Sequence, residues 1–199
     1  MILHDRDIRE PLFDFLEMTY GKNRIIEEKA IGKSRADVLM VTPEALFGIE
    51  IKSDADTYTR LASQVKDYDK YYDYNYVVVG TSHAGHIEEH VPAYWGIITV
   101  EAVDGVMDFY ILRKPAPNPK VKLKKKLEIL WRPELATIQQ WNHMPKYTEK
   151  SKPFVRGRIV EYVEAGKIDA HKLATQISDI LFERDYNTIE AEIKAYKQR

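Results

Sequence analysis

The run YNYVVVG at residues 74–80 is the feature that most constrains the fold of this chain. It is almost continuously apolar, which is typical of a strand buried on both faces of its sheet. Helices must then cover each face, so the run predicts an α/β architecture. Apolar runs such as VVVG and GIITV are strand-length, far below the roughly 20 residues of a membrane-spanning helix, and we expect no membrane partner.

Patterns on either side of this strand supply the other elements. Apolar residues at helical spacing predict a first helix that begins near Arg9, because Pro11 is tolerated only in a first turn. NRIIEEKAI, RADVLMVT and LFGIEIK are predicted strands, and residues 56–72 a helix. SHAGHIEEHV looks helical, and WGIITVE and MDFYILRK look like two later strands. The order αβββαβ predicts a mixed central sheet flanked by helices.

Composition divides the chain into an acidic body and a basic end. Residues 1–114 carry 13 Lys and Arg against 20 Asp and Glu, whereas residues 115–199 carry 17 against 11. We predict a core over residues 1–114, a basic Pro/Lys linker over 115–126, and a helical C-terminal region over 127–199. This asymmetry fits a metal-using enzyme that binds a polyanion, although many other proteins share it.

Cysteine is absent from the sequence, which excludes a disulfide framework, a thiolate-ligated zinc and a cysteine nucleophile. This composition fits a reducing compartment. The start, MILHDRDIREP, is charged from the fifth residue and lacks the apolar segment of a signal peptide. We expect a soluble, cytoplasmic protein.

A tight turn at TPEA, residues 42–45, sets the register of the second and third strands. If Thr42 faces Ala45, then Asp37 faces Glu50, and their Cβ atoms lie about 5 Å apart on one face. Lys52 lies on the same face, opposite Arg35. Charges on a buried sheet face are costly unless they pair with or bind something.

A divalent cation resolves the repulsion between two adjacent carboxylates. Mg²⁺ uses few protein carboxylates and takes the rest of its shell from water and substrate phosphates, and Mn²⁺ favours similar oxygen ligands. Asp37, Glu50 and the backbone carbonyl of Ile51 are therefore the predicted metal ligands. Lys52 would orient the attacking water or stabilise charge developing on phosphorus. Such a site suits phosphodiester hydrolysis.

These residues resemble the PD-(D/E)XK nuclease superfamily, whose core runs helix, three strands, helix, strand. Asp37 is followed after twelve residues by Glu50-Ile-Lys52, and Gln64 and Tyr68 match the Q-x-x-x-Y motif of the RecB-like branch. More narrowly, RADVLMV, GIEIKSDADTYTRLASQVKDY and ILWRPEL are similar to a largely uncharacterised bacterial and phage family of this superfamily.

The resemblance implies a restriction-endonuclease-like core and a Mg²⁺- or Mn²⁺-dependent deoxyribonuclease, although the chemistry also permits RNA. It assigns Asp37, Glu50 and Lys52 to the catalytic centre, with Gln64 and Tyr68 orienting the substrate or the lysine. Glu10 in the first helix matches an additional metal ligand. Gly32 precedes Asp37, as glycine often precedes the first acid in this branch, whereas Ala36 stands where other members have proline.

Two alternatives use other features of the chain. HIEEH, residues 86–90, matches an H-x-x-E-H zinc peptidase pattern that lacks an identified further ligand. A second alternative is a non-catalytic nucleic-acid-binding module, in which basic residues grip phosphates. Those residues are the same ones that a nuclease would use on DNA, and the C-terminal region is also a candidate for self-association into a homo-oligomer. The candidate phosphate-binding residues are Lys122, Lys124, Lys125, Lys126, Arg156 and Arg158.

Overall fold

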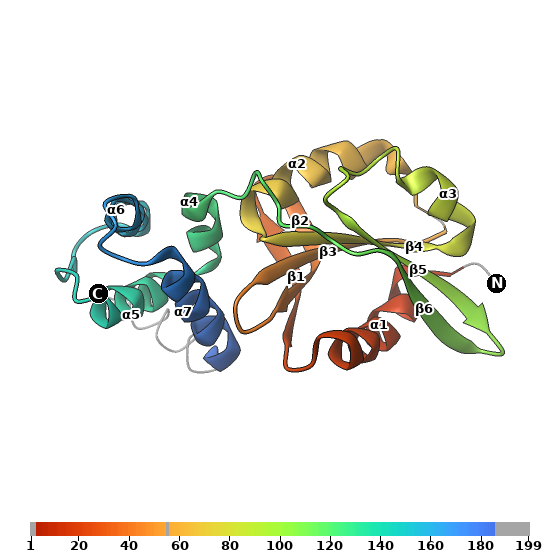
Figure 1. Cartoon of the computed structure of the whole chain (residues 1–199), viewed down its shortest axis with the longest axis horizontal. Coiled ribbons are helices and arrows are strands. Elements are labelled where there is room, and N and C mark those ends of the chain that lie inside the picture. Colours follow the sequence, from red (N-terminus) through yellow and green to blue (C-terminus); the bar gives the residue numbers. More distant parts are fainter. Residues whose placement is uncertain (1–2, 55, 186–199) are drawn as a thin grey trace.

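The computed structural model describes residues 3–54 and 56–185 of the chain (Figure 1). Its centre is a six-stranded sheet in the order β1-β2-β3-β4-β5-β6. The β3/β4 and β4/β5 pairs are parallel and the others antiparallel, which confirms the predicted mixed α/β sheet. The strands are β1 (Arg24–Ile31), β2 (Ser34–Val41), β3 (Leu46–Lys52), β4 (Tyr74–Gly80), β5 (Gly96–Val103) and β6 (Val106–Arg113).

The first helix, α1 (Asp5–Tyr20), begins earlier than the sequence predicts, because Pro11 lies inside it rather than in its first turn. The proline removes one backbone N–H and therefore one helical hydrogen bond. Burial of Ile8, Leu12 and Leu16 against the sheet compensates for that loss. At the start of the helix the His4 N–H donates to the Asp7 carboxylate at 3.0 Å.

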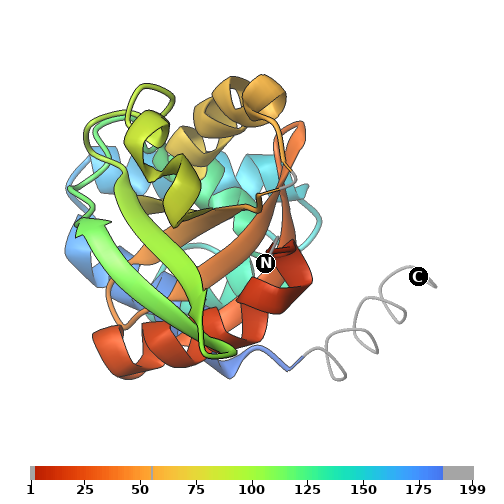
Figure 2. The same ribbon diagram turned by 90° about the vertical axis from the view of Figure 1, so that its right-hand side faces the viewer.

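Two apolar clusters, one on each face of the sheet, form the core. Helix α1 packs with Val38, Ile49 and Val78 on one face. Helix α2 (Leu61–Tyr71) packs on the other face with the alternate positions of the same strands. Figure 2 shows α1 beneath the sheet and α2 above it. β4 is buried along nearly its whole length, as its apolar run predicts.

The segment predicted as a helix over residues 56–72 is shorter and has two parts. A 3₁₀ turn, η1 (Tyr58–Arg60), leads directly into α2. After β4, the 3₁₀ turn η2 (Thr81–His83) and the one-turn helix α3 (Ala84–Ile87) replace the longer helix expected of SHAGHIEEHV. None of the helices in the described residues is long and apolar enough to cross a membrane.

The C-terminal region is helical, and its apolar residues join the cluster on the α2 face of the sheet. Its elements are α4 (Leu123–Lys126), η3 (Leu127–Ile129), α5 (Arg132–Trp141), α6 (Lys152–Glu164) and α7 (Ala170–Glu183). Figure 1 shows these helices beside the β1 and β2 end of the sheet. Residues 186–199, the end of the predicted helical region, lie outside the described residues.

The Pro/Lys segment predicted as a linker is held against α2. Buried Asn118 donates to the backbone carbonyls of Asp69 and Tyr72, both at 2.8 Å. Lys126 is also buried and pairs with Asp73 at 2.6 Å. The segment therefore joins the core to the helical region without forming a free arm.

Candidate active site

The β2/β3 hairpin has the register predicted from its turn. Its pairs run from Val41↔Leu46 to Val38↔Ile49, and Asp37 and Glu50 are the next residues along each strand. At the turn, the Thr42 N–H donates to the Ala45 carbonyl at 3.0 Å. The Arg35 side chain does not join Lys52 on the buried face, because it is exposed and contacts Glu28 instead.

Glu50 is only 1% exposed and is contacted by three polar side chains, two through hydrogen bonds and one through an ion pair. Lys52 lies 2.7 Å from its Oε1, and Gln64 Nε2 donates to the same oxygen. Tyr68 donates to Oε2 at 2.6 Å. Gln64 also accepts from Lys52 Nζ at 3.0 Å, so its amide links the acid and the base. We call these four residues the Glu50 network.

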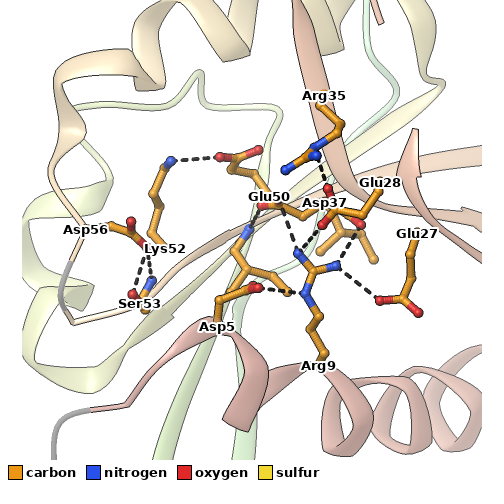
Figure 3. Close-up of polar contacts among 12 residues, drawn as sticks. Asp5, Arg9, Glu27, Glu28, Arg35, Asp37, Glu50, Lys52, Ser53 and Asp56 are labelled. Atoms are coloured by element: carbon orange, nitrogen blue, oxygen red, sulfur yellow. Dashed lines mark hydrogen bonds and ion pairs between the residues drawn. The ribbon is translucent and has the colours of Figure 1, made fainter. Parts of the chain in front are cut away.

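Asp37 joins this network through the backbone. Its N–H donates to the Tyr68 hydroxyl at 3.1 Å, and its Oδ2 accepts from the Ile51 N–H at 2.9 Å. Figure 3 shows Asp37 and Glu50 side by side on the two strands. Burial, followed by the neighbouring charge of Glu50, raises the pKa of Asp37 to about 7. The structure thus brings together the five predicted catalytic residues, along with the buried residue Ile51.

The carboxylate that α1 directs toward Asp37 belongs to Asp5, whereas Glu10, the predicted ligand on this helix, is exposed. Asp5 binds Arg9 Nε at 2.7 Å, and an Arg9 terminal nitrogen lies 3.7 Å from Asp37 Oδ1. No motif in the sequence marks Asp5 or Arg9 as a site residue. Because Pro11 moved the expected start of the helix to Arg9, Asp5 fell outside the predicted element.

Arg9 also reaches two acids on β1. It lies 3.2 Å from Glu27 and 2.6 Å from Glu28, both at carboxylate oxygens (Figure 3). Glu28 has a φ of 55°, an uncommon conformation for a residue that has a Cβ atom. Its carboxylate contacts both Arg9 and Arg35. These ion pairs help to hold this strained position on β1 next to Asp37.

The donor set suits a hard divalent cation that keeps much of its own water. Two adjacent carboxylates, Asp37 and Glu50, are available, and oxygen ligands are those that Mg²⁺ and Mn²⁺ prefer. Within residues 3–54 and 56–185, no cluster of three or more His, Cys, Asp or Glu side chains is arranged to hold a metal ion. Water and substrate oxygens would therefore have to complete the shell.

The histidines of HIEEH do not lie on one helical face, because α3 ends at Ile87. The His90 ring packs on Tyr58 with centroids 4.5 Å apart. His83 also contacts the Tyr58 ring, with centroids 5.9 Å apart, and lies 3.9 Å from Asp54. The helical geometry that the zinc peptidase pattern requires is not formed here.

The predicted phosphate-binding residues separate into two groups. Lys122 and Lys124 are exposed. The other four belong to intramolecular ion pairs: Lys125 and Arg156 with Glu128, Lys126 with Asp73, and Arg158 with Glu161. Only the first group presents ammonium groups freely to solvent along the Pro/Lys segment.

Comparison with known proteins identifies the family to which the chain belongs. Residues 3–196 match a family model described as Bacteriophage P4 protein cII, which covers nearly the whole sequence and agrees with the phage resemblance. Searches of curated proteins and of solved structures gave no match. The family description names no activity. The chain belongs to the bacteriophage P4 protein cII family.

Proposed function

We propose that the protein is a metal-dependent nuclease that hydrolyses phosphodiester bonds, with DNA as its substrate. The observation that carries this proposal is the Glu50 network beside Asp37. A buried lysine and glutamate, a glutamine joining them and a second carboxylate are drawn together on two strands and a helix. A carboxylate with a raised pKa, here Asp37, beside buried charged groups is typical of functional sites.

Asp37, Glu50 and the carbonyl of Ile51 would hold Mg²⁺ or Mn²⁺. When bound, the ion would supply Lewis-acid polarisation of the phosphate and a more acidic water. Tyr68 and Gln64 fix the rotamer of Glu50 through their hydrogen bonds to its two oxygens. The network therefore sets the direction of the carboxylate before any substrate arrives.

Lys52 is the residue that would act on the substrate. Its contacts with Glu50 and Gln64 use two of its three N–H donors. The third would bind the attacking water or a phosphoryl oxygen, where a positive charge stabilises the negative charge that develops in the transition state. Because Glu50 and Gln64 restrain the ammonium, this contact costs little further ordering.

A cleavage assay tests the proposal. Supercoiled, linear and single-stranded DNA, with RNA alongside, would be incubated with Mg²⁺, Mn²⁺ or EDTA. We expect metal-dependent cleavage that falls at least about 100-fold in Asp37→Asn and in Lys52→Ala. Matched controls are Glu44→Gln in the exposed β2/β3 turn and Lys66→Ala on the exposed side of α2, which should cleave like the native protein.

The non-catalytic binding module is the outcome that would replace this proposal. It predicts no cleavage of any substrate, with salt-sensitive binding that Asp37→Asn and Lys52→Ala both retain. Cleavage that persists in both variants would place the catalytic centre elsewhere in the protein. The pattern of products would also separate cutting at ends from cutting within a strand.

A further inference from the structure

A second polar site lies between the sheet core and the C-terminal helices. It is a pocket of about 420 Å³ lined by residues of β1, the β1/β2 turn, α2, α4, η3 and α6. We call it the lysine pocket. Its lining consists of Lys29, Ala30, Gly32, Tyr71, Lys125, Glu128 and Lys152.

Two of the three lysines have only neutral partners. Lys29 Nζ donates to the Ile129 carbonyl at 3.4 Å, and Lys152 Nζ donates to the Glu128 carbonyl at 2.8 Å. Among the described residues, neither ammonium is within salt-bridge distance of a carboxylate. The carboxylate of Glu134 acts on both ammonium groups, and that of Glu128 on Lys152, only from beyond salt-bridge distance. Partly buried cations without a directly paired counter-charge are costly.

The one carboxylate in the lining, Glu128, is already shared. It accepts from Tyr71 at 2.6 Å and pairs with Lys125 and Arg156, each at 3.0 Å. Within the described part of the chain, the buried Nε of Arg156 has no hydrogen-bond partner. Donors and positive charge therefore exceed acceptors and negative charge around the pocket.

The electrostatics of the two lysines agree with this excess. Burial, together with the charges of Arg184 and Lys152, lowers the pKa of Lys29 to about 8. Burial and the charge of Arg156 also lower the pKa of Lys152 below its ordinary value. An anion entering the pocket would offset both effects, because an opposite charge favours the protonated amine.

The pocket and the candidate active site share helix α2 and also involve two neighbouring strands, β1 and β2. Lys29 pairs across the β1/β2 ladder with Ala36, the residue before Asp37. Tyr71 follows Tyr68 by three residues on α2, a rise of about 4.5 Å along the helix. Nucleic acid advances about 3.4 Å per nucleotide along each strand, so a few nucleotides would reach from one site to the other.

We propose that the lysine pocket binds a backbone phosphate of the nucleic acid, a few nucleotides from the bond that is cut. This proposal rests on the proposed function. Lys29 and Lys152 are the residues that would contact the phosphate, while Lys125 and Glu128 shape the wall. A phosphate there would fix the register of the strand relative to Asp37 without reading its sequence.

The test measures DNA binding by fluorescence anisotropy in EDTA, where a metal-dependent enzyme cannot cleave. The variant Lys29→Met/Lys152→Met keeps the aliphatic bulk and removes both charges. We expect about three- to ten-fold weaker binding near 100 mM salt, and a salt slope lower by about one per lost phosphate contact. Lys172→Met, which removes an exposed lysine on α7, is the matched control and should change neither quantity by as much.

Thermal unfolding of the same double variant separates binding from folding. Since both ammonium groups are partly buried beside neutral carbonyls, their removal should leave the melting temperature unchanged or raise it. Weaker binding by an equally stable protein would support the pocket. A clear loss of stability combined with native DNA affinity would assign the two lysines a purely structural role and overturn the proposal.

Inorganic phosphate distinguishes a free ligand from a nucleic-acid backbone. NMR of the lysine Cε resonances should show the pKa of Lys29 rising as phosphate is added to the native protein. If phosphate binds there but the double variant retains native DNA affinity, the pocket serves a small phosphate compound and the backbone proposal is wrong. If the double variant binds DNA poorly while the native protein cleaves nothing, the pocket stands and the nuclease proposal falls.

Discussion

Glu50 and Glu134 are both buried, at 1% and 7% exposure, yet their partners differ in kind. Glu134 forms two hydrogen bonds with Arg184, at 2.7 and 2.6 Å, and accepts the Trp131 N–H at 2.7 Å. Glu50 binds a lysine, an amide and a hydroxyl, and a second carboxylate lies beside it. The partners of Glu134 neutralise its charge and join separate elements of the fold. Around Glu50, by contrast, a lysine and two carboxylates are gathered in one place.

The comparison teaches how a structural acid differs from one placed for chemistry. A bidentate arginine neutralises the charge of Glu134 within a fixed geometry, so a second cation would gain little by binding there. The partners of Glu50 orient it but do not remove the repulsion from Asp37, which remains partly exposed. Burial alone would have ranked the two glutamates alike.

The largest expected effect comes from a substitution that breaks the ion pair between Glu134 and Arg184. Glu134→Ala leaves Arg184 as an uncompensated buried cation and should lower the free energy of unfolding by about 3–5 kcal/mol. Chemical denaturation measures this loss. Cleavage per folded molecule should stay native, and a selective loss of cleavage with normal stability would contradict the structural role.

The next effect is the gain of stability that follows removal of the Asp37 charge, which burial and the neighbouring charge of Glu50 both disfavour. The pKa of Asp37 is raised to about 7 in the folded protein, so the folded state holds a proton that the unfolded chain releases near its ordinary pKa of 3.8. The associated stability is present below about pH 4 and is lost as pH rises toward 7.

Asp37→Asn should therefore make the metal-free protein more stable at pH 8, by about 2 kcal/mol, and flatten its pH dependence between pH 4 and 7. Denaturation in EDTA across this range measures both. Added Mg²⁺ should stabilise the native protein at pH 8 but not the variant. A less stable variant, with unchanged pH dependence, would show that burial and the charge of Glu50 do not raise the pKa of Asp37.

Tyr68→Phe tests whether the Tyr68 hydroxyl orients Glu50 within the Glu50 network. It removes the hydroxyl that donates to Glu50 and accepts from the Asp37 N–H. We expect a loss of about 1–3 kcal/mol in stability, because buried polar groups lose their partner. Cleavage should fall about ten-fold at saturating metal, measured beside Tyr110→Phe, in which the altered hydroxyl is on an exposed residue of β6. Native cleavage by Tyr68→Phe would exclude an orienting role.

The smallest effect concerns α1. Glu10 is exposed, so Glu10→Gln should leave cleavage within about two-fold of native and stability within about 0.5 kcal/mol. Asp5→Asn should have the larger effect on cleavage, because it weakens the hold on Arg9 beside Asp37. Metal titrations of both variants measure the difference. If Glu10→Gln reduced cleavage more than Asp5→Asn, Glu10 would be the α1 carboxylate that acts at the site.

Local patterns predicted the sheet and the centre of the candidate site well. The TPEA turn fixes the β2/β3 register, and the period of a strand then places Glu50 and Lys52 on one face. Tyr68 follows Gln64 by four positions, which sets both on one side of α2, where they contact Glu50. These features depend on short stretches of sequence.

Features that depend on tertiary packing were not predicted from the sequence. Pro11 marks a helix start by its intrinsic preference, but packing of α1 on the sheet extends the helix back to Asp5. Arg9 becomes notable only when folding brings it to Glu27, Glu28 and Asp37. The Pro/Lys segment has the composition of a linker, and Asn118 fixes it to α2 through contacts that no local pattern signals.

The shared apolar cluster on the α2 face has a consequence for how the molecule comes apart. Leu135, Ile159 and Leu173 of the C-terminal helices belong to the same cluster as Leu39 and Val77 of the sheet. The sheet core and the C-terminal helices therefore cannot separate without exposing apolar surface to water. The sheet core and its helical extension are therefore expected to melt in one cooperative transition, and a cut at residue 114 should yield an insoluble fragment.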